Sequence, residues 1–489
     1  MKNTNHAMAR PTFHFTPQRN WMNDPNGLVY DRGLWHLYFQ YNPEGPDWGN
    51  MSWGHATSTD LQHWTEHPVA LPYRDGEQIF SGSVVATPSD VGSLLTACYT
   101  SAYDDGHQAQ SLASSTDGGF TWETDPNNPI LDRNTSAFRD PKVIRSTDAG
   151  GESRWILLAV EADDRQVLIY SSTDLRTWEH QSTFGPLGVD GVVWECPDLI
   201  PLPVNGDPEN IKWVLLLSTN PVGEDPDPGG SSMSYLIGDF DGTTFTPDSS
   251  ELTRLDQGRD FYAGVTFHNA PGNEKIMIGW MSNWSYAGAI PSAPWRGAMS
   301  LPRQLSLRTI GCSPRLIQAP PKFIQEQLGA AEPATTNDLV HAVELTLSGH
   351  SLMELLWDPA TTGTLRLNLR GNADAGVRIE HSPTTGTLHI TRHGAAAQAV
   401  HATFPSTSTV AVDAAAPVRL LLSLDGPLLE LFINDGAATA SNLVVLGTGP
   451  VTARLDSELP GSVAITTADV PAAGALAAFS PAGSATALV

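Results

Sequence analysis

The sequence is poor in cysteine and in positive charge, and it lacks long apolar runs. Its 489 residues include three cysteines, Cys98, Cys196 and Cys312. These are too far apart for a disulfide framework or a C-x-x-C metal pair. No stretch approaches the length of a transmembrane helix. The sequence therefore predicts a protein without structural disulfides and without a membrane partner.

Acidic side chains outnumber basic ones by 53 to 27, which gives a net charge of −26. Such a charge repels nucleic acid and anionic membranes, so neither is an expected partner. A neutral, hydroxyl-rich substrate is compatible with it. The opening residues "MKNTNHAMARPTFHFTP" contain no apolar segment typical of a signal peptide. The sequence as written therefore predicts a cytoplasmic protein, or a secreted one if a leader precedes these residues.

A repeated turn motif organises the first three hundred residues. The segments "ATSTDLQHW", "ASSTDGGFTW" and "YSSTDLRTW" place Asp60, Asp117 and Asp174 at a constant interval of 57 residues. A looser fourth copy, "IGDFDGTTF", contains Asp239, and a fifth segment surrounds "KIMIGWMSNW". Short apolar or alternating runs such as "LWHLYFQY" and "WILLAV" precede the turns and indicate strands. This pattern predicts an all-β protein with a five-bladed β-propeller in residues 1–312, although a series of ordinary hairpins is an alternative.

The character of the chain changes after the last repeat. Residues 313–336 carry prolines and small residues without clear periodicity, which predicts a linker. From residue 337 to 489, alternating runs such as "GTLRLNLR" and "VRLLLSLDG" indicate a β-sandwich. We find no catalytic constellation in this second region, so we expect it to contribute stability or outer binding surface.

Three acidic residues and one serine occur at a similar phase of the repeat. Asp24 of "WMNDPNG" and Ser81 of "FSGS" each precede a repeat aspartate by 36 residues, and Asp140 of "FRDP" does so by 34. Glu195 of "WECP" precedes Asp239 by 44 residues, a looser match. Each motif alone is typical of an ordinary turn or strand end. If the repeats are blades, however, these side chains converge on the central channel.

Converging carboxylates without cysteine ligands suit acid–base chemistry or a hard cation. A calcium site normally has a denser local set of oxygen ligands, so we predict no metal. Two carboxylates on an aromatic-lined site favour cleavage of a glycosidic bond.

A set of longer blocks strengthens this interpretation. "WMNDPNG", "FSGS", "FRDP", "WECPDL", "FYAGVTF" and "GWMSNWSYAGAIPSAPWRGAMSLPRQLSL" resemble, in order, the signature blocks of glycoside hydrolase family 32. That family contains invertases, exo-inulinases and levanases, and its fold is a five-bladed propeller followed by a β-sandwich. The blocks span about residues 13–307, and the last is most similar to the levanase and exo-inulinase branch.

The resemblance implies a role for each matching residue. Asp24 is the expected nucleophile, Glu195 the general acid/base, and Asp140 the stabiliser of the transition state. The expected substrate-binding residues are Asn23, Gln40, Trp48, Phe80, Ser81, Arg139 and Trp284. The implied activity is retaining hydrolysis of terminal β-D-fructofuranosyl residues of fructans or sucrose, without a cofactor.

Two alternatives remain open at this point. One is a fructosyltransferase that uses the same intermediate, and the other is a non-catalytic carbohydrate-binding propeller. The preferred linkage (β-2,6 levan, β-2,1 inulin or sucrose) and the oligomeric state also stay open.

Overall fold

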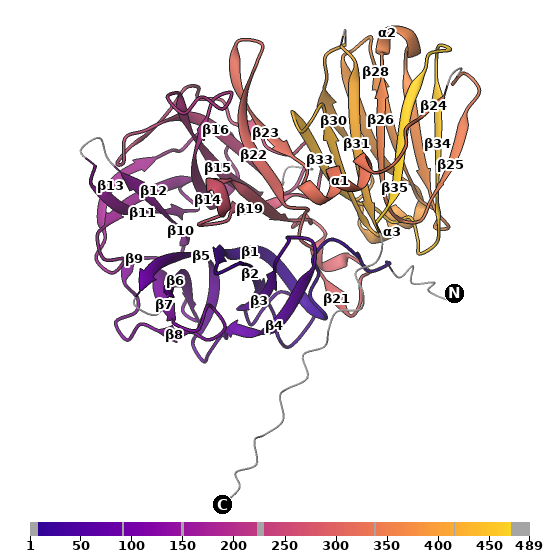
Figure 1. The fold of residues 1–489 in the computed structure, drawn as a ribbon. Coiled ribbons are helices and arrows are strands. Elements are labelled where there is room, and N and C mark those ends of the chain that lie inside the picture. The colour runs from indigo at the N-terminus through magenta and orange to yellow at the C-terminus, as the bar shows by residue number, and fades with distance from the viewer. Residues whose placement is uncertain are drawn as a thin grey trace, which may run out of the picture.

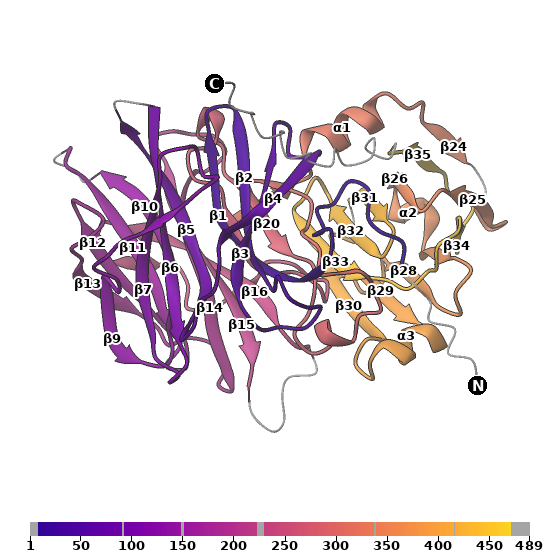
Figure 2. The ribbon, with the colours of Figure 1, turned by 90° about the horizontal axis from the view of Figure 1, so that it is seen from below.

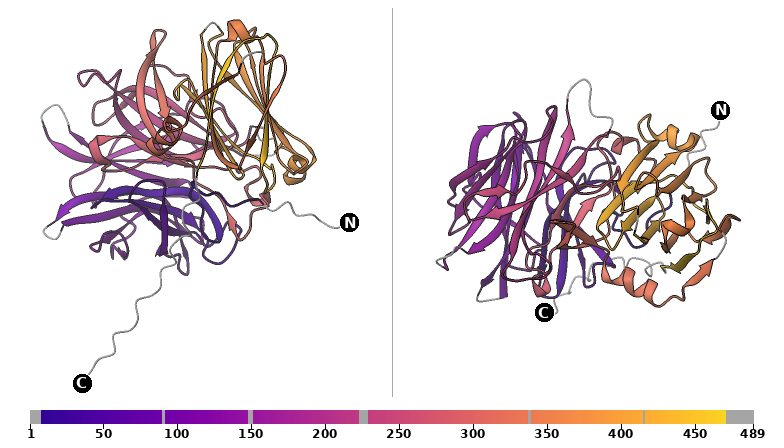
Figure 3. Two further views of the ribbon diagram at one scale, coloured as in Figure 1. Left: turned by 45° about the vertical axis from the view of Figure 1, so that its right-hand side comes forward. Right: turned by 90° about the horizontal axis from the view of Figure 1, so that it is seen from above.

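The computed structural model describes residues 8–89, 92–147, 151–222, 229–336, 339–414 and 416–470. Five sheets of mainly antiparallel strands follow one another along the first part of the chain, and two six-stranded sheets follow them. Figure 1 shows the five sheets, coloured indigo to pink, arranged as a propeller beside the orange and yellow sandwich. The two domains also lie side by side in the views of Figures 2 and 3. The fold class predicted from the repeats and the family resemblance is therefore confirmed.

Each blade is a meander of strands from one continuous segment. The first blade contains β1 (Asn20–Asp31), β2 (Leu34–Tyr41), β3 (Ser52–Ser58) and β4 (Trp64–Leu71). The second contains β5 (Glu77–Ser89), β6 (Gly92–Tyr103), β7 (Gln108–Ser115), β8 (Glu123–Thr124) and β9 (Leu131–Thr135). The third contains β10 (Phe138–Thr147), β11 (Ser153–Glu161), β12 (Gln166–Ser172) and β13 (Glu179–Phe184).

The last two blades follow the same plan. The fourth contains β14 (Val192–Pro203), β15 (Ile211–Pro221), β16 (Ser232–Phe240), β17 (Phe245–Pro247) and β18 (Thr253–Arg254). The fifth contains β19 (Tyr262–Thr266), β20 (Ile276–Trp280), β22 (Arg303–Ile310) and β23 (Ser313–Ala319), with the 3-10 turns η1 (Pro271–Asn273) and η2 (Ala287–Ala289). Between β20 and β22 the chain forms β21 (Trp295–Arg296), which pairs in parallel with β1 and so ties the fifth blade to the first.

The first strands of the blades form the inner ring of the propeller. β1 contacts β5, β5 contacts β10, β10 contacts β14, β14 contacts β19, and β19 contacts β1. The apolar core lies between neighbouring blades: Val29 and Tyr38 of the first blade pack with Ile79 and Val84 of the second. Residues that occupy one position of this ring can therefore meet at the propeller axis.

The repeat aspartates hold the outer turns of the blades. Asp60 and Asp174 each accept hydrogen bonds from the backbone N–H groups two and three residues further on, and Asp117 from those three and four residues further on. In the fourth blade this role belongs to Asp241. The sequence assigned it to Asp239, which lies within β16. The prediction was wrong by two residues because "DFD" offers two aspartates and sequence spacing alone does not choose between them.

The predicted linker, residues 313–336, is largely structured. Ser313–Ala319 form β23, which pairs with β22 along its whole length and completes the fifth blade. Lys322–Gly329 form helix α1, and Ala334–Thr336 form β24, an edge strand of the sandwich. The prolines that suggested a linker are compatible with β23 because it is the edge of its sheet, where a missing N–H costs no ladder bond.

The sandwich consists of two antiparallel sheets around its own apolar core. One sheet has the order β24, β35 (Val463–Asp469), β26 (His350–Trp357), β31 (Val418–Asp425), β32 (Leu428–Ile433), β33 (Ala438–Leu443). The other has the order β25 (Val343–Leu347), β34 (Val451–Ser457), β27 (Leu365–Arg370), β28 (Gly376–Ser382), β29 (Thr387–His393), β30 (Ser406–Ala411). Short helices α2 (Pro359–Thr362) and α3 (Ala395–Val400) lie in the connections. Within the described ranges, no helix is long and apolar enough to cross a bilayer.

Buried charges join the two domains. The imidazole of His14 lies 2.8 Å from Asp425 and 3.0 Å from Glu430, and Arg303 contacts both Glu430 and Asp256. Burial alone would lower the pKa of His14, but the two carboxylates raise it to about 9. Removing one partner of such a buried pair leaves an uncompensated charge, which costs about 3–5 kcal/mol. The network therefore fixes the sandwich against the propeller.

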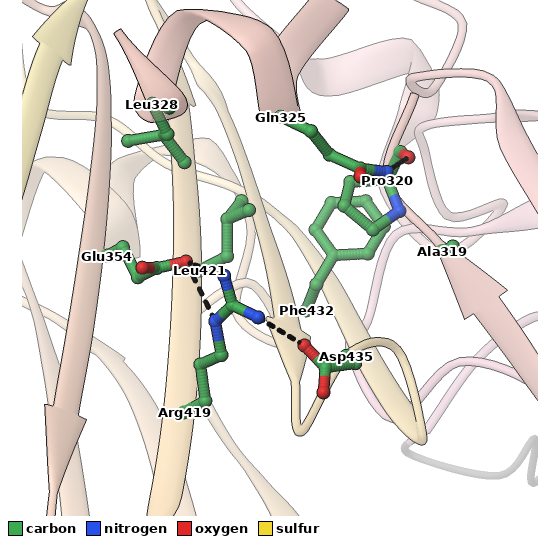
Figure 4. A pocket seen from close by; sticks show the side chains of 10 residues that line it. Ala319, Pro320, Gln325, Leu328, Glu354, Arg419, Leu421, Phe432 and Asp435 are labelled. Carbon is green, nitrogen blue, oxygen red and sulfur yellow. Dashed lines mark hydrogen bonds and ion pairs between the residues drawn. The ribbon is translucent and has the colours of Figure 1, made fainter. Parts of the chain in front are cut away.

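A cavity of about 380 Å³ lies between α1 and the outer face of the sandwich (Figure 4). Leu421 and Phe432 line its apolar side. Arg419 lies between two carboxylates, 2.7 Å from Glu354 and 2.6 Å from Asp435. Because one guanidinium joins carboxylates from two other parts of the sheet, we interpret the group as a structural link between β26, β31 and the β32–β33 turn.

Candidate active site

A β-bulge interrupts every inner strand of the propeller. In each case the inner strand gains one residue relative to its neighbour. The five shifts fall between Met22 and Pro25, Phe80 and Gly82, Arg139 and Lys142, Glu195 and Asp198, and Tyr262 and Val265. Bulges of this kind bend a strand and re-aim its side chains, and they are common beside active sites.

The sequence explains why the bulges form where they do. The residues at these positions are Asp24, Ser81, Asp140, Cys196 and Ala263, and each is followed by proline or glycine. Proline cannot donate to the strand ladder. Gly82 approaches the neighbouring strand so closely that a Cβ would lie 2.1 Å from the Cys98 carbonyl oxygen. Asp140, Cys196 and Ala263 adopt positive φ values of 62°, 48° and 51°, strain that a fold maintains mainly at functional positions.

Four of the five bulge residues meet around two carboxylates. The Ser81 hydroxyl donates to Oδ2 of Asp24 at 2.8 Å, and the backbone N–H of Cys196 donates to Oδ2 of Asp140 at 2.9 Å. The Cys196 sulfur lies 3.7 Å from Oδ2 of each carboxylate. Both aspartates are buried. Oδ1 of Asp24 has no hydrogen-bond partner among the described residues.

Glu195 occupies a different position from the one that the spacing predicted. It immediately precedes the bulge, and Cys196 takes the place equivalent to Asp140. Arg139 and Tyr262 also immediately precede their bulges. The Arg139 guanidinium donates to Oε1 of Glu195 at 3.0 Å, and the Tyr262 hydroxyl donates to Oε2. The two groups therefore hold both oxygens of Glu195 beside the aspartate pair.

Burial and mutual repulsion control the ionisation of the aspartates. Burial and the charge of Glu195 raise the pKa of Asp24 to about 6, against the opposing hydrogen bond from Ser81. Burial also raises the pKa of Asp140, and Arg139 partly opposes this shift. Burial alone would lower the pKa of Arg139, but the charges of Glu195 and Asp140 raise it, so the guanidinium stays cationic. At neutral pH Asp24 is thus mainly an ionised carboxylate.

These groups form one side of a cavity of about 340 Å³. The cavity brings together all ten site residues predicted from the sequence, and Gln108 and Asn220 in addition. Its lining consists of Asn23, Asp24, Gln40, Trp48, Phe80, Ser81, Gln108, Arg139, Asp140, Glu195, Asn220 and Trp284.

The added residues Gln108 and Asn220 lie at the start of β7 and near the end of β15. They belong to no block quoted for the family resemblance, which is why they were not among the predicted site residues. Tyr262 lies within the block "FYAGVTF", but its contact with Glu195 depends on the packing of β19 against β14.

Aromatic side chains shape the rest of the cavity. Trp284 stacks on Trp21 with ring centroids 6.0 Å apart, and Trp21 donates through its indole N–H to the Asn23 side chain at 2.8 Å. Gln40 donates to the Ile79 carbonyl at 3.0 Å. Trp48 is 48% exposed and packs edge-on against Phe80, so it lies at the rim. The cavity is therefore aromatic at its walls and acidic at its base, which suits a small polyol.

Comparison with known proteins agrees with this geometry. The family described as "Glycosyl hydrolases family 32 N-terminal domain" matches residues 14–320, and its C-terminal counterpart matches residues 321–457. The chain belongs to glycosyl hydrolase family 32. This family assignment makes the protein a glycoside hydrolase, and it confirms the resemblance noted from the sequence blocks.

Individual relatives are similar over most of this chain. A levanase of Bacillus subtilis is 35% identical over 457 residues, which cover 89% of this chain and 66% of the levanase. The crystal structure of an exo-inulinase from Aspergillus awamori matches with a TM-score of 0.86 at 34% identity, over 95% of this chain and 98% of that one. The structure of a β-fructofuranosidase from Schwanniomyces occidentalis in complex with fructosyl-erythritol matches with a TM-score of 0.84 at 30% identity. The match covers 94% of this chain and 98% of that one.

Proposed function

We propose that the protein is a retaining β-fructofuranosidase that releases terminal non-reducing β-D-fructofuranosyl residues from fructans and sucrose. The relatives named levanase, exo-inulinase and invertase support this substrate class. The observation that carries the proposal is the state of Asp24. It is a buried carboxylate with one unpartnered oxygen, and it lines the same cavity as a second carboxylate held by Arg139 and Tyr262.

In the first step Oδ1 of Asp24 attacks the anomeric carbon of the fructosyl unit. The glycosidic bond breaks, and Glu195, which must be protonated at the start of this step, gives its proton to the leaving oxygen. A fructosyl ester forms on Asp24. In the second step water attacks the same carbon while Glu195 accepts the proton of the water, and the ester bond to Asp24 breaks. Fructose is released with retained configuration, and both carboxyl groups return to their starting states.

The remaining groups support these steps without forming bonds to carbon. Asp140 accepts from the Cys196 backbone and is buried beside Asp24, a position suited to binding fructosyl hydroxyls and the charge that develops in the transition state. Ser81 donates to Asp24 and stabilises its ionised form. Trp284 provides an apolar wall for the sugar ring, and Trp48 at the rim is suited to contact the leaving group.

Hydrolysis and fructosyl transfer share the ester intermediate, so they differ in what attacks it. At high sucrose concentration, release of free fructose identifies a hydrolase, whereas accumulation of longer oligosaccharides identifies a transferase. A product time course on levan, inulin and sucrose then ranks the three substrates.

The proposed roles of Glu195 and Asp140 are tested with a substrate that needs no acid. The fluoride ion of a fructosyl fluoride leaves without protonation. Glu195→Gln should therefore form the fructosyl ester from this substrate but fail to cleave sucrose. Hydrolysis of that ester should stay slow, because the variant lacks the base for water, and azide should accelerate it and give a fructosyl azide of retained configuration. Asp140→Asn should show no azide rescue. Rescue of Asp140→Asn with none for Glu195→Gln would reverse the two assignments.

A further inference from the structure

The propeller segment that leads into β19 runs along the edge of the sandwich. Backbone N–H groups of Gln257 and Asp260 donate to the carbonyls of Thr439 and Ser441 in β33, at 2.8 and 3.0 Å. Two residues after Asp260, Tyr262 donates to the carboxylate of Glu195. The position of the proposed acid therefore depends on a segment that the sandwich holds.

One sandwich side chain joins this segment to a second wall of the cavity. The guanidinium of Arg392, at the end of β29, donates to Oδ2 of Asp260 at 2.8 Å and to the Tyr286 hydroxyl at 3.1 Å. The same hydroxyl donates to Oδ1 of Asp260 at 2.6 Å. Further bonds from Arg392 reach the Leu443 carbonyl at 2.9 Å and the Ser406 hydroxyl at 3.0 Å. Asp260, Tyr286 and Arg392 thus form a closed triangle of hydrogen bonds.

The triangle is fully enclosed in the protein. Asp260 is 0% exposed, and Tyr286 and Arg392 are each 2% exposed. The Arg392 guanidinium also lies 4.2 Å from the ring centroid of Phe404. A planar guanidinium is the side chain that can bond a carboxylate, a hydroxyl and a carbonyl at once, and lysine cannot reproduce that fork.

Tyr286 belongs to the turn that carries the aromatic wall. Its backbone N–H donates to the Asn283 carbonyl at 3.1 Å, and the Asn283 side chain donates to the Arg259 carbonyl at 2.8 Å. Between them, Trp284 lines the cavity and stacks on Trp21. The turn 283–286 and the segment 259–260 are therefore fastened to each other at two places, by Asn283 and by the triangle.

We propose that Arg392 of the sandwich is a positioning residue for the active site. Acting through Asp260 and Tyr286, it fixes Tyr262 against Glu195 and Trp284 against the sugar. The sandwich then contributes to catalysis itself, beyond the stability and outer surface expected from the sequence. This inference rests on the proposed function, because the cavity must bind and cleave a fructosyl substrate for the positioning to matter.

Two substitutions, each of which removes a different part of the triangle, test the proposal. Arg392→Lys keeps the charge but loses the fork, and Tyr286→Phe removes the hydroxyl that bonds both Arg392 and Asp260. A matched control is Asp425→Asn, which removes a fully buried cross-domain carboxylate whose partners, His14, His350 and Thr12, lie outside the cavity lining. All three variants are assayed on sucrose well below their unfolding temperatures, with kcat and KM measured separately.

We expect Arg392→Lys and Tyr286→Phe to lower kcat/KM about tenfold, with a raised KM from the displaced Trp284 and a reduced kcat from the displaced Tyr262. The double variant should be no worse than the poorer single variant, since both act through one triangle. Asp425→Asn should lower the unfolding temperature but keep kcat/KM within about twofold of the wild type.

Equal kcat/KM in Arg392→Lys, Asp425→Asn and the wild type overturns the proposal. If Arg392→Lys does not fold, Tyr286→Phe decides alone, and an unchanged kcat/KM in that variant also overturns it. Wild-type protein that fails to cleave sucrose, levan and inulin refutes the proposed function instead, so the two failures are distinct.

Discussion

Ser81 should set the pH at which the nucleophile becomes active. Its hydroxyl donates to Oδ2 of Asp24 at 2.8 Å, and this bond favours the ionised carboxylate. A hydrogen bond to a charged group contributes about 1.5 kcal/mol, and one pKa unit corresponds to about 1.4 kcal/mol. Ser81→Ala should therefore raise the pKa of Asp24 from about 6 to roughly 7.

At pH 6 the ionised fraction of Asp24 should then fall from about a half to about a tenth. The acidic limb of kcat/KM for sucrose, which reports the free enzyme, should move upward by about one pH unit. At pH 8 both proteins are mainly ionised, so this effect should leave kcat/KM there nearly unchanged.

Ser83→Ala is the matched control for this experiment. Ser83 lies two residues further along β5 and is also buried, but its hydroxyl bonds the Pro141 carbonyl and the Val143 N–H instead of Asp24. The acidic limb of kcat/KM for the Ser83→Ala variant should coincide with that of the wild type. An acidic limb in Ser81→Ala that stays in place or moves to lower pH would show that the Ser81 bond does not control Asp24.

Variants at three positions, Asp24, His36 and Asn220, test further consequences of the structure. Asp24→Asn should lower kcat by several orders of magnitude, and a variant that keeps more than about a tenth of wild-type kcat contradicts the assignment of the nucleophile. The same variant should gain up to about 3 kcal/mol of stability at pH 8, because the folded pKa of about 6 lies above the unfolded value of 3.8. Calorimetry should show the gain vanish as the pH falls below about 4. His36, buried against His55 at 3.1 Å, has a pKa lowered by burial to about 4, so its contribution to stability should be lost as the pH falls from 6.5 toward 4. Relative to the wild type, His36→Gln should therefore flatten the fall of the unfolding temperature in that window, and identical slopes would refute the reasoning. Asn220→Ala should lower kcat/KM for sucrose about tenfold but spare a fructosyl fluoride if Asn220 contacts the leaving group; equal losses on both would place it against the fructosyl unit.

The repeat made the propeller predictable because a blade is a local structure. Each S-T-D turn and the strands before it come from one continuous segment, so spacing in the sequence translates into spacing around the ring. The same spacing brought Asp24, Ser81 and Asp140 together correctly. It misplaced Glu195 by one residue because the fourth interval, 44 residues from Glu195 to Asp239, is longer than the other three and does not define the equivalent position to a single residue.

Other features depended on contacts between distant segments and left no local signal. The pairing of β21 with β1 joins the ends of the propeller, and Asn220 lines a cavity built from several blades. In the sequence, Arg392 is an ordinary residue of an alternating strand. Its proposed positioning role depends on the contact between β29 and the propeller segment at Asp260. The prediction of a linker in residues 313–336 was wrong for another reason. β23 pairs with β22 although its sequence contains a proline.

The five bulges also explain how a symmetric scaffold supports asymmetric chemistry. Each bulge presents one residue toward its neighbours, and the chain uses Asp24, Ser81, Asp140, Cys196 and Ala263 for these five places. Burial and neighbouring carboxylates already raise the pKa of both Asp24 and Asp140 in this ring, and further carboxylates would favour protonation of the nucleophile. The other three places therefore hold residues with small side chains. Two of these residues donate to the carboxylates, Ser81 through its hydroxyl and Cys196 through its backbone N–H. The third acid is instead displaced by one residue, beside the fixed cation of Arg139. An additional carboxylate at the fully buried Ala263 should thus impair the enzyme, because it would add charge to the ring without adding a counter-ion.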